Sequence, residues 1–141
     1  MTEPTPEQSS PATTRALDGI KVLDVGTYIA GPAAATVMSD FGAEVIKIEP
    51  PGGDPYRELR RQPGYPESEH NFAWLADSRN KRSIVLDLTK DEARGVLHRL
   101  VAETDVFITN FPLPVRERLA IRHQDLAPRN DRLIYASLTA Y

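Results

Sequence analysis

The chain has 141 residues, of which 40% are hydrophobic and 26% are charged, and its formal net charge is -3. These values are typical of one soluble globular domain, and the net negative charge argues against a nucleic-acid binder held by bulk positive charge. Cysteine is absent, which excludes disulfides, thiolate nucleophiles and cysteine metal sites. The absence also fits a cytoplasmic protein.

Residues 1–16 are predicted to form a disordered tail. They are rich in Pro, Ser and Thr and have no aliphatic side chain before Ala12, so they cannot bury enough apolar surface to offset the entropy lost on ordering. The tail lacks the basic start and apolar core of a secretory signal. No apolar run elsewhere is long enough to span a bilayer. We therefore expect one domain over residues 17–141, with no membrane contact.

Strands and helices are predicted to alternate along this domain. Short β-branched, apolar runs indicate strands, and apolar residues at helical spacing indicate helices. Gly42 is expected to end the first helix, and Thr89 with Glu92 forms a capping-box pattern before a later one. The predicted strands are residues 20–25, 45–48, 83–88, 105–108 and 133–137; the predicted helices are residues 32–41, 71–77, a segment after Thr89 and residues 112–119, with a proline-rich loop at 50–66 and a turn at 125–130.

This alternation predicts an α/β fold with an incomplete doubly wound, mainly parallel, Rossmann-like sheet and helices on both faces. In such sheets, ligands bind at the carboxyl ends of the strands, near the point where the strand order reverses. Candidate ligand-binding residues should therefore follow the strands, at residues 26–31, 49–53, 86–89, 109–112 and 139–141.

Two features of the first half are ambiguous. The loop from Gly26 to Pro32 precedes a helix whose free N–H groups can hold an anion, but it has neither a GxGxxG nor a Walker A pattern. It therefore fits a phosphate site or simply a tight connection. Glu49 lies where a dinucleotide fold places its ribose-binding acid. Without the glycine pattern, we favour a solvated acid at a strand end.

Several cations and one asparagine also have two interpretations. Lys81 and Arg82 either bind an anion or form a basic turn before a strand. Asn110, at the end of the fourth strand, either bonds a ligand or caps the loop. Arg116 and Arg118 either face a ligand or lie on a solvated helix face.

The residues alone reveal no catalytic constellation or metal site. None of the three histidines has a second ligand at metal-binding spacing. No serine lies in a recognisable nucleophile elbow. Asp24, within a predicted strand, is expected to bond neighbouring backbone groups.

Five segments in fixed order carry a resemblance to a known family: LDGIKVLDVGTYIAGP, DFGAEVIKIEPPGGDPYR, NKRSIVLDL, TDVFITNF with VRERL, and RLIYASLTAY. Together they resemble the amino-terminal part of the CoA-transferases of family III, which include formyl-CoA transferase, carnitine CoA-transferase and alpha-methylacyl-CoA racemase. The resemblance runs from Leu17 to Tyr141. It implies interlocked homodimers that take acyl-CoA and carboxylic acids as substrates, without a metal or a dissociable cofactor. It also implies an aspartate nucleophile and an aspartyl-CoA intermediate.

The resemblance implies CoA contacts at four places. Ile29 and Ala30, in the loop before the first helix, would face CoA and the acyl group. The adenosine would be lined by Leu86, Asp87, Leu88 and Thr89. The pantetheine or nucleotide would be followed by Asn110, Phe111 and Pro112, and a phosphate would meet Arg118.

Three departures from the family qualify this expectation. Ile29 stands where formyl-CoA transferase has a glutamine, which argues against formate or oxalate as substrate. Pro50 stands where some relatives have an arginine, so one phosphate contact is expected to be missing. The nucleophilic aspartate of the family lies downstream of ASLTAY, as do the acid and base of the racemases. We therefore expect these 141 residues to lack transferase activity by themselves.

Two other functions remain compatible with the sequence. The chain could be a stand-alone module that binds CoA or another adenine nucleotide, or an inactive gene remnant. An NAD-dependent oxidoreductase is disfavoured because the glycine pattern is missing.

Overall fold

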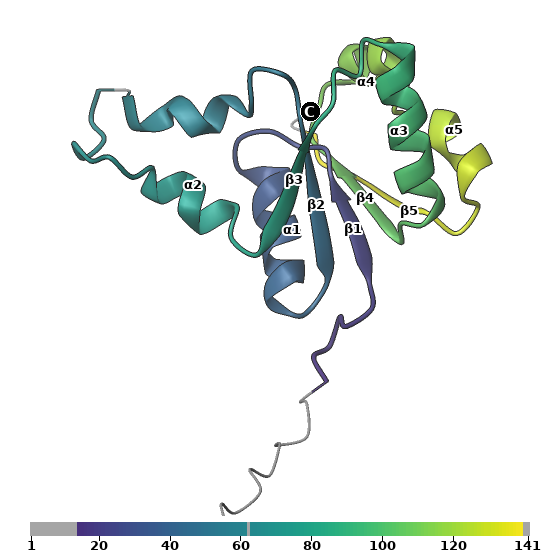
Figure 1. Ribbon diagram of the computed structural model, residues 1–141, viewed down its shortest axis with the longest axis horizontal. Helices are drawn as coiled ribbons and strands as arrows, with labels where there is room; N and C mark the ends of the chain where they lie inside the picture. Colours follow the sequence, from purple (N-terminus) through teal and green to yellow (C-terminus); the bar gives the residue numbers. More distant parts are fainter. Residues whose placement is uncertain (1–13, 62, 140–141) are drawn as a thin grey trace, which may run out of the picture.

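Five parallel strands form a single sheet in the order β3-β2-β1-β4-β5 (Figure 1). The computed structural model describes residues 14–61 and 63–139. The chain passes from β1 outward to β3 and then returns to β4 on the other side of β1, so the strand order reverses between β1 and β4. The predicted α/β, Rossmann-like parallel sheet is confirmed. The strands are β1 (Lys21–Asp24), β2 (Glu44–Glu49), β3 (Lys81–Val85), β4 (Val106–Thr109) and β5 (Ile134–Ser137).

Helices cover both faces of the sheet. Figure 1 shows α1 and α2 on one side and α3, α4 and α5 on the other. The helices are α1 (Ala30–Asp40), α2 (Phe72–Asp77), α3 (Asp91–Ala102), α4 (Leu113–Leu119) and α5 (His123–Leu126), with 3₁₀ turns η1 (Pro55–Arg61) and η2 (Ala127–Arg129).

The apolar core is split into two layers because side chains alternate along each strand. Leu23 and Phe107 pack with Leu97 and Val101 of α3 on one face. Val22, Val45 and Ile108 pack with Ala35 of α1 on the other. The same alternation determines which charged side chains of the strands point toward α1.

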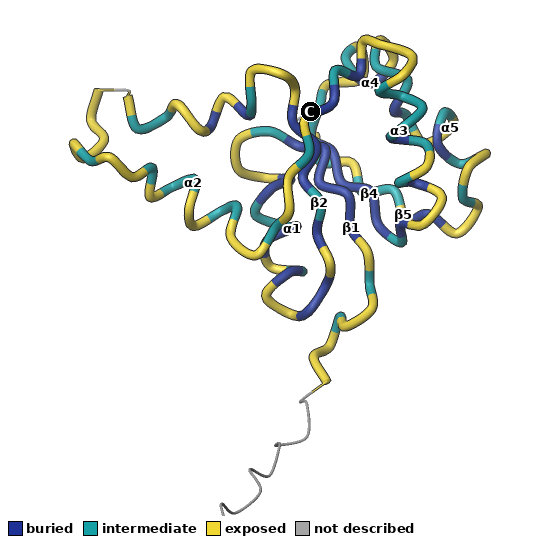
Figure 2. Tube along the Cα trace, in the orientation of Figure 1, coloured by how far each residue is buried: buried dark blue, intermediate teal, exposed yellow. Residues whose placement is uncertain are grey.

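The central strands are the most buried part of the molecule (Figure 2). β3 and β5 form the two edges of the sheet, where Val85 is 58% exposed and Ile134 is 63% exposed. In the part of the chain that the structure describes, no helix is long and apolar enough to cross a membrane. Residues 1–13 of the predicted tail lie outside the described residues.

The predicted end of α1 is confirmed. Gly42 has a φ of 110°, its N–H donates to Ser39 O, and the N–H of Ala43 donates to Met38 O. These two bonds satisfy the free carbonyls at the helix end, and the left-handed backbone that they require favours glycine.

Three local predictions were wrong. The strand predicted at 83–88 occupies residues 81–85, because the ladder with β2 ends after Leu86: Leu86 N still donates to Glu49 O, but Leu88 N turns back and donates to Leu86 O. The capping box at Thr89 does not form: α3 begins after Lys90, and the Thr89 hydroxyl donates to Asp87 instead. The turn predicted at 125–130 is largely helical, within α5 and η2.

Candidate functional site

A pocket of ≈ 260 Å³ opens at the carboxyl edge of the sheet, between the segment after β3 and helix α4. It lies beside the reversal point between β1 and β4, which is where open α/β sheets hold their ligands. Its wall is mostly apolar, with polar groups at the ends of the strands. The lining residues are Val25, Ile48, Glu49, Pro50, Leu86, Asp87, Leu88, Thr89, Phe111, Val115, Arg118 and Leu119.

The fold brings six of the ten predicted contact residues into this one pocket. They come from two segments more than twenty residues apart in the sequence. Parallel strands end at the same edge of a sheet, so the segments that follow β3 and β4 meet there. The six residues are Leu86, Asp87, Leu88, Thr89, Phe111 and Arg118.

The polar mouth of the pocket is ordered by a short turn. Asp87 Oδ1 accepts hydrogen bonds from the Thr89 hydroxyl at 2.6 Å and from the Thr89 N–H at 3.1 Å. These bonds lower the pKa of Asp87, so the carboxylate is ionised at neutral pH. Arg118, exposed on α4, supplies a cation to the same pocket. The mouth can therefore present both an anion and a guanidinium to a ligand.

The other four predicted contact residues do not line this pocket. Asn110 bonds the loop before α1, with its Oδ1 accepting from Thr27 N and its Nδ2 donating to Thr27 O, both at 2.8 Å. Of the two interpretations of Asn110, the structure therefore shows the loop cap. Ile29 and Ala30 are exposed at the start of α1, and Pro112 is exposed just before α4.

Glu49 is not the solvated acid that we favoured from the sequence. Its side chain is only 2% exposed. It accepts two hydrogen bonds of 2.7 Å from Arg57, one from the Ser83 hydroxyl and one from Asp54 N. Burial alone would raise the pKa of Glu49, but these hydrogen bonds and the Arg57 charge lower the pKa to about 2. The carboxylate is thus engaged within the chain.

Lys81 and Arg82 do not act as a pair. The Lys81 side chain is 2% exposed, and its Nζ donates to Asp24 Oδ2, to Pro32 O and to Asp77 O. Burial lowers the pKa of Lys81, and the Asp24 charge opposes this effect. Arg82 lies on the opposite face, exposed beside Glu44. The predicted basic turn is wrong, because both residues lie within β3, and the Lys81 ammonium is already engaged within the chain.

Arg116 and Arg118 also separate. Arg116 is buried, and its Nη1 donates to the Ser137 hydroxyl at 2.6 Å. Within residues 14–61 and 63–139, its Nε has no hydrogen-bond partner and no carboxylate forms an ion pair with it. The solvated helix face is therefore wrong for Arg116, whereas Arg118 is exposed on α4 and also lines the pocket.

A set of charged and aromatic residues next to the loop before α1 was not predicted from the sequence. Lys47 and Asp54 are buried together, and the Arg57 guanidinium lies 3.8 Å from the centre of the Trp74 ring. One signal was present: Lys47 and Glu49 alternate with apolar residues in a central parallel strand, where both faces are normally apolar.

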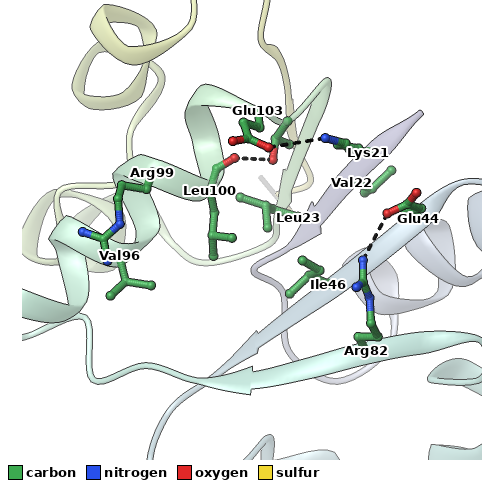
Figure 3. Close-up of a pocket in the computed structure, with 11 residues that line it drawn as sticks. Lys21, Val22, Leu23, Glu44, Ile46, Arg82, Val96, Arg99, Leu100 and Glu103 are labelled. Atoms are coloured by element: carbon green, nitrogen blue, oxygen red, sulfur yellow. Dashed lines mark hydrogen bonds and ion pairs between the residues drawn. The ribbon is translucent and has the colours of Figure 1, made fainter. Parts of the chain in front are cut away.

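A second pocket, of ≈ 420 Å³, lies near the amino ends of the strands, between α3 and the strands β1 and β2 (Figure 3). Leu23, Ile46 and Leu100 line it, and the exposed ion pairs Lys21–Glu103 and Arg82–Glu44 lie at its rim. It contains no predicted contact residue and lies away from the carboxyl edge. We therefore place the candidate site in the smaller pocket.

Residues 17–141 match the family model described as CoA-transferase family III. The chain belongs to this family. It is 42% identical over 134 residues to a probable fatty acyl-CoA transferase of Mycobacterium tuberculosis, covering 94% of this chain and 33% of that protein. It is 36% identical over 129 residues to the cinnamoyl-CoA:phenyllactate CoA-transferase of Clostridium sporogenes, covering 91% of this chain and 31% of that enzyme.

Solved structures of family III proteins share the fold. The orthorhombic crystal structure of the same Mycobacterium tuberculosis protein superposes with a TM-score of 0.81 at 41% identity, covering 91% of this chain and 35% of the other. A CAIB/BAIF family protein from Brucella suis gives a TM-score of 0.81 at 36% identity, covering 92% and 34%. The family III chain thus spans about a third of the length of the relatives that it matches.

Proposed function

We propose that the chain is the CoA-binding, amino-terminal part of a transferase that moves CoA between carboxylic acids. The observation that carries this proposal is the pocket at the carboxyl edge, where six residues implied by the family resemblance lie together. Membership of CoA-transferase family III supports the reaction class. Because the chain spans about a third of its relatives, the activity is proposed for a longer protein.

The pocket suits the nucleotide end of CoA. Leu88 and Phe111 offer apolar surface to a flat adenine ring, because aromatic and aliphatic side chains pack well on ring faces. Arg118 is placed to meet a phosphate, since a guanidinium binds phosphate oxygens through paired N–H donors. The pantetheine arm would then extend along the carboxyl edge toward Ile29 and Ala30.

The chemistry would follow nucleophilic catalysis by a carboxylate. An aspartate oxygen attacks the thioester carbonyl, and the C–S bond breaks to give a mixed anhydride and the CoA thiolate. The thiolate then attacks the aspartyl carbonyl and releases the first carboxylic acid, leaving aspartyl-CoA. The acceptor carboxylate repeats both steps in reverse order, which regenerates the aspartate and forms the new acyl-CoA.

The chain's own buried carboxylates are unsuited to the nucleophilic role. Asp24, Glu49 and Asp54 are nearly inaccessible and are bonded to cations or backbone N–H groups. We propose that the nucleophile lies outside these 141 residues, which alone would transfer no CoA, and that the complete protein is an interlocked homodimer. The resemblance to family III supports both proposals, because it implies an aspartate downstream of ASLTAY and an interlocked dimer.

Isothermal titration calorimetry of the purified chain with CoA and with NAD tests the binding proposal. We expect CoA to bind and NAD not to bind. Arg118→Met should weaken CoA binding at least fivefold, while Arg99→Met, in the other pocket, should leave it unchanged. A folded chain that binds no CoA would refute the proposal.

A coupled assay with acyl-CoA and a carboxylic acid tests the catalytic part. Measurable transfer by the purified chain alone would contradict the proposal that the nucleophile lies elsewhere. If the chain binds CoA and neither the chain nor any longer protein that contains it transfers CoA, a CoA-binding module without transferase activity would be favoured instead.

A further inference from the structure

Four charged side chains lie together beneath the loop that joins β1 to α1. The side chains of Asp24, Lys47, Asp54 and Lys81 are each 2% exposed or less. Lys47 Nζ lies 2.9 Å from Asp54 Oδ2 and 3.6 Å from Asp24 Oδ2. Lys81 Nζ lies 2.9 Å from the same Asp24 oxygen. The cluster therefore balances two ammonium groups against two carboxylates.

This charged cluster is bonded to the backbone of the loop above it. Lys47 Nζ donates to Gly26 O at 2.9 Å, and Asp24 Oδ1 accepts from Gly26 N at 3.1 Å. Asp54 Oδ1 accepts from Tyr28 N at 3.3 Å. With the Asn110 bonds to Thr27, side chains from four other places in the sequence hold three consecutive loop residues.

Stability alone does not explain this arrangement. Burying charges carries a desolvation cost, and apolar residues often replace buried ion pairs without loss of stability. Tyr28 has a φ of 58°, in the left-handed region that is unfavourable for a non-glycine residue. The loop also leaves Tyr28 48% exposed and Ile29 54% exposed. Such unfavourable features, held in place by the surrounding structure, cluster at ligand sites.

We infer that Lys47 and Asp54 are positioning residues, which fix residues 26–28 so that Tyr28 and Ile29 face the pantetheine and acyl end of the ligand. This inference rests on the proposed function, because it assumes that acyl-CoA lies along the carboxyl edge. Neither residue would touch the ligand, since both side chains are buried beneath the loop. Their effect would pass through the backbone bonds to Gly26 O and Tyr28 N.

The first test measures how strongly the loop backbone is protected from hydrogen exchange when no ligand is present. Lys47→Met/Asp54→Ala removes one charge of each sign, whereas Lys47→Met/Asp54→Asn keeps a carbonyl oxygen that can accept from Tyr28 N. Amide hydrogen exchange, followed by NMR, reports the opening of single hydrogen bonds. We expect the Tyr28 amide to exchange at least tenfold faster in the alanine variant and to recover protection in the asparagine variant. Unchanged exchange in a folded alanine variant would overturn the inference.

The second test separates the two ends of the ligand. Calorimetry compares CoA with adenosine 3',5'-bisphosphate, which lacks the pantetheine arm. In the alanine variant, we expect the CoA affinity to fall at least tenfold and the bisphosphate affinity to stay within twofold. A purely structural role would lower the melting temperature and leave the ratio of the two affinities unchanged, and that result would overturn the inference.

A control variant and a fallback variant complete the two tests. Arg82→Met removes an exposed cation of the neighbouring strand and should change neither readout. If the alanine variant does not fold, the asparagine variant carries the binding test, because it still lacks the Lys47 bond to Gly26 O and should lose CoA affinity at least threefold. If the unmodified chain binds neither ligand, the proposed function fails, and the exchange result alone decides on the positioning of the loop.

Discussion

Lys81 Nζ lies 2.9 Å from Asp24 Oδ2, and the two side chains are 2% and 0% exposed. This ion pair joins the edge strand β3 to the central strand β1 across β2. It also connects the sheet to two helices, because Lys81 donates to Pro32 O in α1 and to Asp77 O at the end of α2. Lys81 of β3 thus bonds to residues of β1, α1 and α2.

Replacement of Lys81 by methionine is expected to destabilise the chain by about 3–5 kcal/mol, because it leaves the Asp24 carboxylate buried with only the more distant Lys47 beside it. Arg82→Met at the next position should change the free energy of unfolding by about 0–1 kcal/mol, since the Arg82–Glu44 pair is exposed. Urea unfolding of both variants measures the difference. Equal losses of unfolding free energy in the two variants would show that the buried Lys81–Asp24 pair contributes no more to stability than the exposed Arg82–Glu44 pair.

Stability is expected to depend on the ionisation of Glu49 in acid. The pKa of Glu49 is about 2 in the folded chain, below its ordinary value of 4.5, so the ionised carboxylate stabilises the fold at neutral pH. This contribution should be lost as the pH falls from about 4.5 through about 2. In urea unfolding at a series of pH values, Glu49→Gln should flatten this part of the profile. An unchanged slope would mean that other carboxylates account for it.

Two glycines should respond to alanine in opposite directions. A Cβ at Gly26 would lie 3.0 Å from Pro32 Cδ and 3.1 Å from Asn110 Oδ1, so Gly26→Ala should cost about 1–3 kcal/mol by forcing the loop apart. A Cβ at Gly95 meets nothing within 4 Å in the interior of α3, and Gly95→Ala should add about 0.5–1 kcal/mol. Thermal or urea unfolding of the two variants measures whether Gly26→Ala lowers and Gly95→Ala raises the free energy of unfolding.

Arg116 offers a test of an unpaired buried charge. Its Nε has no partner in the described part of the chain, so Arg116→Met should leave the 141-residue chain as stable as before or stabilise it by about 1 kcal/mol. Arg116→Lys keeps the charge and should bring no gain. A loss of more than 1 kcal/mol in the methionine variant would indicate that the Ser137 bond outweighs the cost of burial.

The sequence was sufficient to predict the fold class. Short β-branched runs alternate with segments of helical spacing, and this pattern has few solutions other than a parallel sheet with helices on both faces. It also placed candidate residues near the carboxyl ends of the strands, and thereby most of the candidate pocket, although β3 ends at Val85 and not at Leu88 as predicted. Leu86 to Thr89 and Phe111 follow strands, so a parallel sheet must bring them to one edge.

The sequence did not reveal which charged residues are buried. Lys81 and Arg82 are adjacent cations, and their different environments depend on where β3 begins and therefore on which side chain points toward α1. Glu49 looked like a solvated acid because its partners Arg57 and Ser83 lie eight and thirty-four residues away in sequence.

The sequence by itself therefore determined the order of the elements, the parallel sheet and the edge at which the candidate residues lie, because local periodicity is encoded within a few residues. Only the tertiary structure decided that Asn110 holds the loop before α1 and that Lys47, Asp54 and Lys81 lie beneath it. The reason is physical: the environment of a charge depends on groups that distant segments bring within a few ångströms.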